Sequence, residues 1–182
     1  MATAVFIDGG YLSSLLRDYF GKARIDYQKL THFACNGDSV FRAYYYDCLP
    51  YQSAVPTDEE RERFSNAQRF TYTLNKLPRF TVRLGKLVFR GYDENGKPIF
   101  KQKRVDLLLG IDLASLVNMK SVSGISLIAG DSDLIPAFEH AHGAGFTTTL
   151  VHGPAKTYHQ DLWDLADERL EIAGEEIQKL AR

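Results

Sequence analysis

The sequence predicts an α/β fold with a mainly parallel central sheet. Short apolar or β-branched segments alternate with segments of helical periodicity along all 182 residues, the pattern typical of strand–helix–strand units. Residues 123–131 are apolar almost throughout, as expected of a strand buried on both faces. No internal repeat, low-complexity tract or linker interrupts this pattern. We therefore expect one domain over residues 1–182.

The first part of the chain predicts two strands separated by helices. An apolar run at 3–10 ends in Asp-Gly-Gly and predicts the first strand. Leucines recur at helical spacing through 11–21, which predicts a helix with Gly21 at its C-terminal end. A shorter helix is expected at 26–34. Residues 39–47 are rich in β-branched and aromatic side chains and predict the second strand.

The middle of the chain predicts a long helix and a hairpin. Residues 49–56 are expected to form a loop. Thr57 is a good N-cap for a helix over 57–77, which has acidic residues in its first turn. The alternating segment 79–103 is broken by turn-forming residues at 93–98, so it predicts a strand and an inserted β-hairpin.

The last part predicts further strand–helix units. An apolar stripe predicts a helix over 104–119, and the buried strand at 123–131 follows. A helix at 132–145 is closed by glycines, and residues 146–153 predict another strand. Residues 158–172 are expected to form the terminal helix, whose surface acids and apolar residues could support a homodimer.

Composition narrows the class of protein. Lys and Arg total 22 and Asp and Glu total 23, which argues against a polybasic binder but permits a local basic face. The two cysteines, Cys35 and Cys48, form no CxxC pair and are typical of a reducing compartment. The N-terminus lacks the features of a signal peptide, and no apolar run approaches the ~20 residues of a membrane span. We expect a cytoplasmic protein that does not contact membranes.

Several acids fall where a predicted strand meets a predicted helix. Asp8 ends the first strand, and Asp131 and Asp133 follow the buried strand. If these two strands are neighbours, their carboxylates converge at one edge of the sheet. Asp106 opens a helix and is a fourth candidate. Asp112 lies six residues later, about 120° around that helix, so it cannot face the same ion as directly.

Such a set of acids suits a divalent cation. Hard oxygen ligands without His or Cys select Mg²⁺ or Mn²⁺, and these ions activate water and neutralise charge on a phosphodiester. A simpler interpretation also exists for each acid taken alone. Asp131 or Ser132 could cap the following helix, Asp8 could be a turn former, and Asp106 could stabilise a helix start.

Three segments resemble a known family. "VFIDGGYL", "KRVDLLLGIDL" and "LIAGDSDLIPAFEHAHGAG", in this order, are similar to the NYN domain proteins of the LabA-like group, relatives of the PIN ribonucleases. The resemblance covers residues 5–145, and "GDSDLIP" is its most specific part. It implies a PIN-like, Rossmannoid three-layer sandwich and a Mg²⁺- or Mn²⁺-dependent nuclease that acts on RNA.

The resemblance also implies roles for individual residues. The catalytic, metal-binding acids of the family match Asp8, Asp106, Asp131 and Asp133. Asp112 matches a further recurring acid, to which we assign no role.

Three other residues are candidate substrate ligands. Lys103 matches a family lysine that could contact a phosphate. Tyr11 stands where many members have Asn, and could hydrogen-bond or stack on a base. Ser132, between the two acids, could hydrogen-bond water or phosphate.

The most basic stretch of the chain runs through the hairpin region. Its basic residues alternate with aromatic and apolar residues, a composition that suits single-stranded RNA; they are Arg79, Arg83, Lys86, Arg90, Lys97, Lys101, Lys103 and Arg104. A solvated strand face with aromatics in the core is the alternative.

We therefore expect a metal-dependent endoribonuclease that hydrolyses RNA, with single-stranded RNA as its substrate. The alternative is a catalytically weak module that binds RNA or a protein on the same fold. A phosphatase with an aspartyl nucleophile would need DxD after the first strand, where this chain has "DGG". A Toprim enzyme would need a glutamate there.

Overall fold

The computed structural model describes residues 1–182 and alternates strands and helices as predicted. In chain order the elements are β1 (Ala2–Asp8), α1 (Gly9–Tyr19), α2 (Tyr27–Ala34), β2 (Ser39–Asp47), α3 (Asp58–Leu74), β3 (Phe80–Leu84), β4 (Lys86–Tyr92), β5 (Pro98–Lys103), α4 (Val105–Leu116), β6 (Gly124–Ile128), the 3₁₀ helix η1 (Ser132–Leu134), α5 (Ile135–Gly143), β7 (Thr147–His152), α6 (Gln160–Leu165), β8 (Glu168–Glu171) and α7 (Gly174–Leu180).

Six strands form one parallel sheet in the order β3-β2-β1-β6-β7-β8. The chain moves outward from β1 to β2 and β3, and then continues on the other side of β1 with β6, β7 and β8. The strand order therefore reverses between β1 and β6, which are hydrogen-bonded neighbours with Ile7 opposite Ile128. In a sheet of this type, ligands bind outside the carboxyl ends of the strands at this switch point.

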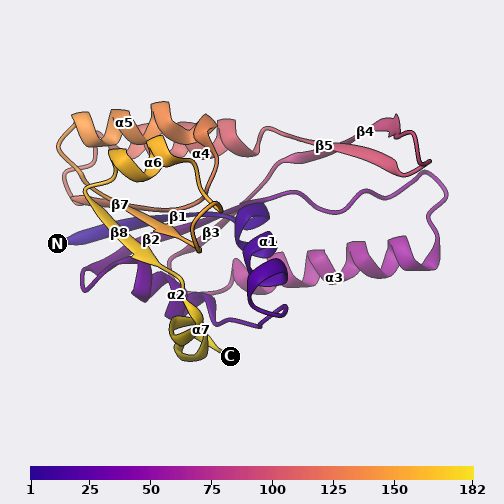
Figure 1. Ribbon diagram of the computed structural model, residues 1–182, viewed down its shortest axis with the longest axis horizontal. Coiled ribbons are helices and arrows are strands. Elements are labelled where there is room, and N and C mark those ends of the chain that lie inside the picture. The colour runs from indigo at the N-terminus through magenta and orange to yellow at the C-terminus, as the bar shows by residue number, and fades with distance from the viewer.

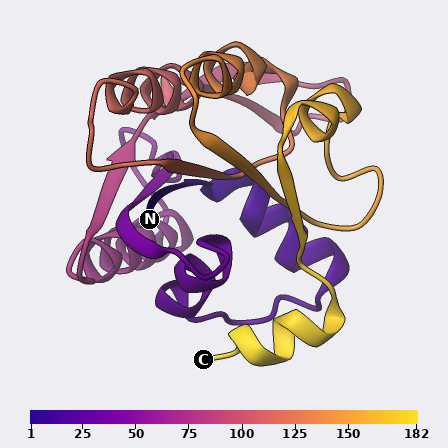
Figure 2. The same cartoon turned by 90° about the vertical axis from the view of Figure 1, so that its left-hand side faces the viewer.

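Helices cover both faces of the sheet and complete a three-layer sandwich. Helices α4, α5 and α6 lie on one face, and α1, α2 and α7 lie on the other (Figures 1 and 2). Because side chains alternate along a strand, Phe6 of β1 enters the core beneath α4 and α5, while Ile7 enters the core beneath α1 and α2. Both side chains are fully buried. The predicted α/β architecture is confirmed.

Side-chain caps fix the starts of the first three helices. The carboxylates of Asp8 and Asp26 accept backbone N–H groups at the starts of α1 and α2. Thr57 and Glu60 form a capping box at the start of α3, as the sequence around Thr57 suggests.

The β4–β5 hairpin and much of α3 project beyond the sheet on the same side (Figure 1). Helix α3 buries only Leu74, at its end nearest the sheet. The hairpin forms a separate two-stranded antiparallel sheet, and every residue of β5 is exposed.

The predicted terminal helix over 158–172 is wrong. Helix α6 ends at Leu165, and Glu168–Glu171 form β8, the parallel edge strand beside β7. The carboxylate of Asp167 accepts both the N–H and the hydroxyl of Thr148, at 2.8 Å each, and this pairing draws the chain alongside β7. The single helix on which we based the expected homodimer is therefore absent.

Candidate active site at the switch point

Asp8 lies at the carboxyl end of β1, beside the point where the strand order reverses. Its Oδ1 accepts the N–H of Tyr11 at 3.1 Å, which caps α1. The side chain is half-buried. Burial raises its pKa to about 6, and the negative charges of Asp106 and Asp47 contribute to this increase. Asp8 is thus a carboxylate that is partly removed from water and lies near other negatively charged carboxylates.

Asp131 and Asp133 follow β6, the strand next to β1. Asp131 accepts the N–H of Asp133 at 3.1 Å and begins η1, and both acids are exposed. Asp106 is exposed in the first turn of α4. Its pKa is raised by burial and then by the charges of Asp131 and Asp133.

Asp106 is therefore within electrostatic reach of both strand ends, since its charge also acts on Asp8. We call the four acids Asp8, Asp106, Asp131 and Asp133 the carboxylate edge. Asp131 does cap η1, as its simpler interpretation suggested, whereas Asp8, for which that interpretation was a turn former, caps α1. Both acids nevertheless lie at or just after the carboxyl ends of neighbouring strands.

An open groove of about 880 Å³ runs beside three of the predicted residues. Asp106, Ser132 and Asp133 line it together with apolar side chains of α4 and α5, including Ile111 and Ala137. The groove gives solvent and ligands direct access to the exposed part of the carboxylate edge.

Asp112 has other partners. Arg83 donates two hydrogen bonds to its carboxylate, at 2.9 and 3.0 Å, and the hydroxyl of Tyr46 donates another at 3.0 Å. The Asp112 side chain is only 15% exposed, and it does not line the groove beside Asp106. These contacts tie α4 to the sheet, so Asp112 is not brought together with the other four acids.

Tyr11 joins helix α1 to two loops at the carboxyl ends of the strands. Its hydroxyl accepts the N–H of Gly153 at 2.9 Å and hydrogen-bonds to the hydroxyl of Thr157 at 3.1 Å. Its ring packs against Gly130, where an added Cβ would lie 2.6 Å from the ring. The hydroxyl that we expected to contact substrate is therefore already hydrogen-bonded within the protein.

Asp47 is an acid that the sequence interpretation left out of the site. It ends β2, the other neighbour of β1, and accepts the Tyr45 hydroxyl at 2.9 Å and the N–H of Cys48 at 2.7 Å. Burial raises its pKa. Its position at a strand end, the same signal that indicated Asp8, was available in the sequence.

The hairpin leads directly into the carboxylate edge. Lys103 is the exposed last residue of β5 and lies three residues before Asp106. A Cβ at Gly10 would lie 3.3 Å from Oδ1 of Asp8 and 3.6 Å from Nε2 of Gln102. The Gln102 amide is therefore close to Asp8 and is a second candidate residue that the sequence interpretation missed.

The donor set fits Mg²⁺ or Mn²⁺ in its chemistry, because all its ligand atoms are carboxylate oxygens. No three His, Cys, Asp or Glu side chains are grouped closely enough to hold a metal ion between them. Mg²⁺ commonly uses one or two carboxylates and completes its shell with water and substrate phosphate. The carboxylate edge suits this mode of binding, in which few carboxylates contact the ion and water or phosphate supplies the other ligands.

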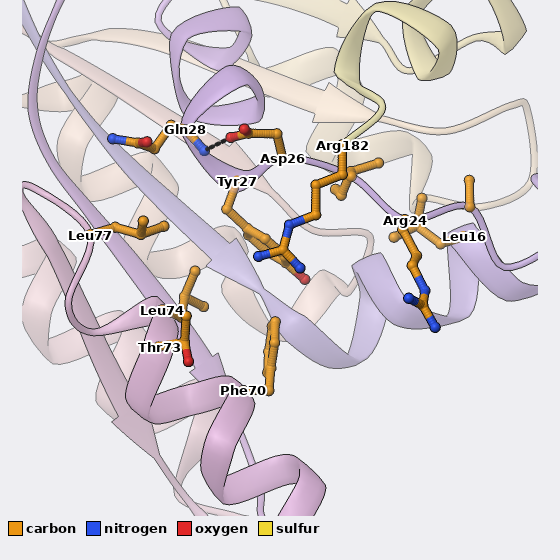
Figure 3. A pocket seen from close by; sticks show the side chains of 12 residues that line it. Leu16, Arg24, Asp26, Tyr27, Gln28, Phe70, Thr73, Leu74, Leu77 and Arg182 are labelled. Atoms are coloured by element: carbon orange, nitrogen blue, oxygen red, sulfur yellow. Dashed lines mark hydrogen bonds between the residues drawn. The ribbon is translucent and has the colours of Figure 1, made fainter.

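A more enclosed cavity, of about 520 Å³, lies between α1, α2 and α3 near the end of the chain (Figure 3). Its lining includes Tyr27, Phe70, Arg24 and Arg182, and none of the predicted acids. The candidate site is thus an exposed edge and groove, separate from this cavity.

None of the helices is both long and apolar enough to span a membrane.

No curated protein matches the chain. The fold is similar to the crystal structure of VPA0982, a protein of unknown function from Vibrio parahaemolyticus, with a TM-score of 0.67 and 19% sequence identity. That likeness covers 96% of this chain and 94% of the other, and it supports the fold alone.

The family model for the NYN domain matches residues 2–172, nearly the whole length of the chain. The match extends from β1 to the residue after β8, so it includes the carboxylate edge and the hairpin. Assignment to the LabA-like group stays a prediction. The chain belongs to the NYN domain family, which is part of the PIN-like nuclease superfamily.

Proposed function

We propose that this protein is a Mg²⁺- or Mn²⁺-dependent endoribonuclease that hydrolyses RNA at the carboxylate edge. The observation that carries the proposal is the position of its acids. Asp8 ends β1 and Asp131 follows the neighbouring strand β6 at the switch point, and the charge of Asp106 acts on the acids at both places. Membership of a nuclease superfamily agrees with this chemistry.

The electrostatics of the edge favour a cation. Burial first, and then repulsion between neighbouring acids, raises the pKa of both Asp8 and Asp106, so the ionised edge is destabilised in the free protein. A divalent ion at the edge would remove that repulsion. RNA is a polyanion, and these carboxylates repel its phosphates unless such an ion compensates their charge.

Each residue of the site has a task that its position supports. Asp106 and Asp133 line the groove, and Asp131 is exposed next to Ser132. These acids would hold the ion directly or through its water shell, with Asp8 fixed by its hydrogen bond to α1. When bound, the ion supplies an activated water and neutralises charge on the phosphodiester. The Lys103 ammonium, three residues from Asp106, would bind a substrate phosphate, and Ser132 would position one from the groove.

A second candidate function is a catalytically weak module that binds RNA or a protein. The observation in its favour is that no three potential ligands are close enough to hold a metal between them. This module would bind through the same basic surface and would not depend on a metal.

Cleavage of a labelled single-stranded RNA, with Mg²⁺, Mn²⁺ or EDTA, separates the two functions. We expect metal-dependent cleavage that falls by more than about 10³-fold in Asp131→Asn, because a lost ligand removes transition-state stabilisation of about 4 kcal/mol. Glu175→Gln, at an exposed acid in the first turn of α7, is the matched control and should cleave like the wild type. RNA binding that is indifferent to metal and to Asp131→Asn, without cleavage, would support the module instead.

A further inference from the structure

The β4–β5 hairpin exposes several large apolar and aromatic side chains. Phe89 and Phe100 are each 37% exposed and Tyr92 is 68% exposed. A two-stranded hairpin is marginally stable alone in water, and contiguous exposed apolar side chains usually mark an interaction site. This hairpin therefore has the character of a binding surface.

Four aromatic rings gather on one face of the hairpin. Phe89 and Phe100 are directly opposite each other across the two strands, with ring centroids 5.8 Å apart. Tyr51, from the loop before α3, lies 5.1 Å from the Phe100 ring and 5.9 Å from the Phe89 ring. The rings support one another, so their outer surfaces are held in place before any ligand arrives.

A β-bulge brings the fourth ring, Tyr92, to the same face. Residues three apart on a strand normally point to opposite faces, but the pairing shifts by one residue between Phe89 and Gly91. Gly91 has a φ of +112°, which suits a bulge. Tyr92 consequently lies against Phe89, with their ring centroids 5.2 Å apart. We call these four residues and the β4–β5 hairpin the arm.

The charge of the arm favours a polyanion. Residues 86–103 contain five basic side chains and two acidic ones, and none of the five basic groups is in an ion pair. Lys101 and Lys103 alternate with Phe100, so they add positive charge from the other face and leave the rings accessible. Two copies of this arm packed together would repel each other.

The aromatic face continues to the carboxylate edge. Gln102 follows Phe100 on the same face of β5, and its amide lies beside Gly10 and Asp8. The six residues of β5 span about 20 Å. One end of the arm is thus at the acids, and the other end is far enough away to contact several nucleotides.

We infer that the arm is a stacking platform that holds unpaired nucleotides of the substrate beside the carboxylate edge. This inference rests on the proposed nuclease function and specifies how RNA is held. Stacking on aromatic rings requires bases whose faces are free, so the arm selects single-stranded segments over duplex. Lysine and arginine side chains of the arm add attraction to the phosphates.

Binding without cleavage tests the arm by itself. We would measure the fluorescence anisotropy of a labelled oligouridine in EDTA, and compare it with the same strand annealed to its complement. Tyr92→Leu keeps an apolar side chain but removes the ring, and we expect about tenfold weaker binding of the single strand. Tyr92→Phe restores the ring and should bind like the wild type. The duplex should bind more weakly than the single strand and should be insensitive to Tyr92→Leu.

The chain offers a matched control for this substitution. Tyr72 on α3 is 67% exposed, nearly the same as Tyr92, and lies outside the aromatic cluster. Tyr72→Leu should leave binding unchanged. Lys101→Gln should lower the slope of log affinity against log salt by about 0.7, and Lys120→Gln, at an exposed lysine outside the arm, should not.

Three results would overturn the inference: wild-type binding by Tyr92→Leu, equal weakening by Tyr72→Leu, or equal affinity for the duplex. A dimer that Tyr92→Leu converts to monomer, with RNA affinity unchanged, would show that a second copy covers the arm. Failure of the nuclease proposal looks different. In that case the arm would bind single strands with the expected dependence on Tyr92, and no metal would produce cleavage.

Discussion

The acids at the switch point form two groups that differ in their surroundings. The inner pair, Asp8 and Asp47, ends the adjacent strands β1 and β2, and both carboxylates accept hydrogen bonds from groups around them. The outer group, Asp106, Asp131 and Asp133, is exposed at the start of α4 and around η1. Asp8 belongs to the carboxylate edge, while Asp47 lies behind it.

This difference gives the two groups of acids different expected roles. The inner carboxylates are fixed by hydrogen bonds. They are also partly removed from water, and this burial raises the pKa of both. The outer carboxylates keep access to solvent, and Asp106 and Asp133 line the groove, so they can turn toward a cation without breaking a core contact. We therefore expect the outer group to carry metal binding and the inner pair to set the charge behind it.

The largest expected effect is on catalysis. Asp106→Asn should reduce metal-dependent RNA cleavage by more than about 10³-fold and weaken Mn²⁺ binding in a calorimetric titration, because Asp106 lines the groove and its charge acts on the acids at both strand ends. Asp47→Asn should cost less than about tenfold, since asparagine can still accept the Tyr45 hydroxyl. Equal losses in the two variants would show that the inner and outer acids act as one unit.

The second effect is on stability and depends on pH. The pKa of Asp8 is about 6 in the folded protein, against 3.8 without burial, so folding favours the protonated acid. The favourable contribution of protonated Asp8 to the free energy of unfolding is fully present below pH 3.8 and is lost as the pH rises through 6. In EDTA at pH 7.5, Asp8→Asn should therefore raise the free energy of unfolding by about 1–3 kcal/mol, and asparagine keeps the helix cap.

Urea denaturation at pH 7.5 and pH 4 checks this expectation. The gain from Asp8→Asn should largely disappear at pH 4, where wild-type Asp8 is protonated in the folded protein. A gain of equal size at both pH values would mean that ionisation of Asp8 is not its source. Cleavage should be lost in the same variant, as is common where active sites trade stability for function.

The placement of the carboxylate edge was accessible from sequence because parallel strands align their carboxyl ends. Asp8 and Asp131 each follow an apolar run, and the only missing fact was that β1 and β6 are neighbours. The hairpin was equally accessible, since turn-forming residues interrupt an alternating segment between β4 and β5. Both features depend on local sequence patterns, namely apolar runs that end in an acid and turn-forming residues between alternating segments.

Other features depend on contacts between distant segments, which local patterns do not encode. The apolar spacing of 158–172 suits a helix, but pairing of Asp167 with Thr148 makes part of it the edge strand β8. The role of Asp112 is decided by Arg83, which is 29 residues away in the sequence. The hydroxyl of Tyr11 is occupied by Thr157, 146 residues away.

The third effect tests how the outer group is positioned. Gly130 immediately precedes Asp131, and an added Cβ would collide with the carbonyl oxygen of Thr157 and lie 2.6 Å from the Tyr11 ring. Gly130→Ala should lower the free energy of unfolding by about 1–3 kcal/mol and reduce cleavage by displacing Asp131. Thermal and urea unfolding measure the first change, and cleavage at saturating metal measures the second.

A glycine elsewhere provides the control for this substitution. Gly143 lies at the end of α5, and an added Cβ there would meet no atom within 4 Å. Gly143→Ala should be neutral or slightly stabilising. If both substitutions destabilise the protein equally, close packing at Gly130 does not explain the position of the outer acids.

The smallest expected effect concerns an acid on the same helix as Asp106 that belongs to neither group. Asp112→Asn should lower the free energy of unfolding by about 0.5–1.5 kcal/mol because it weakens the charged contact with Arg83, while asparagine still accepts the Tyr46 hydroxyl. Cleavage per folded molecule should stay within about threefold of wild type. A double-mutant cycle with Arg83→Gln should give a coupling energy of about 1 kcal/mol. If Asp112→Asn instead removes metal-dependent cleavage at unchanged stability, α4 contributes two acids to the reaction, and exposure at the groove is not what selects its catalytic side chains.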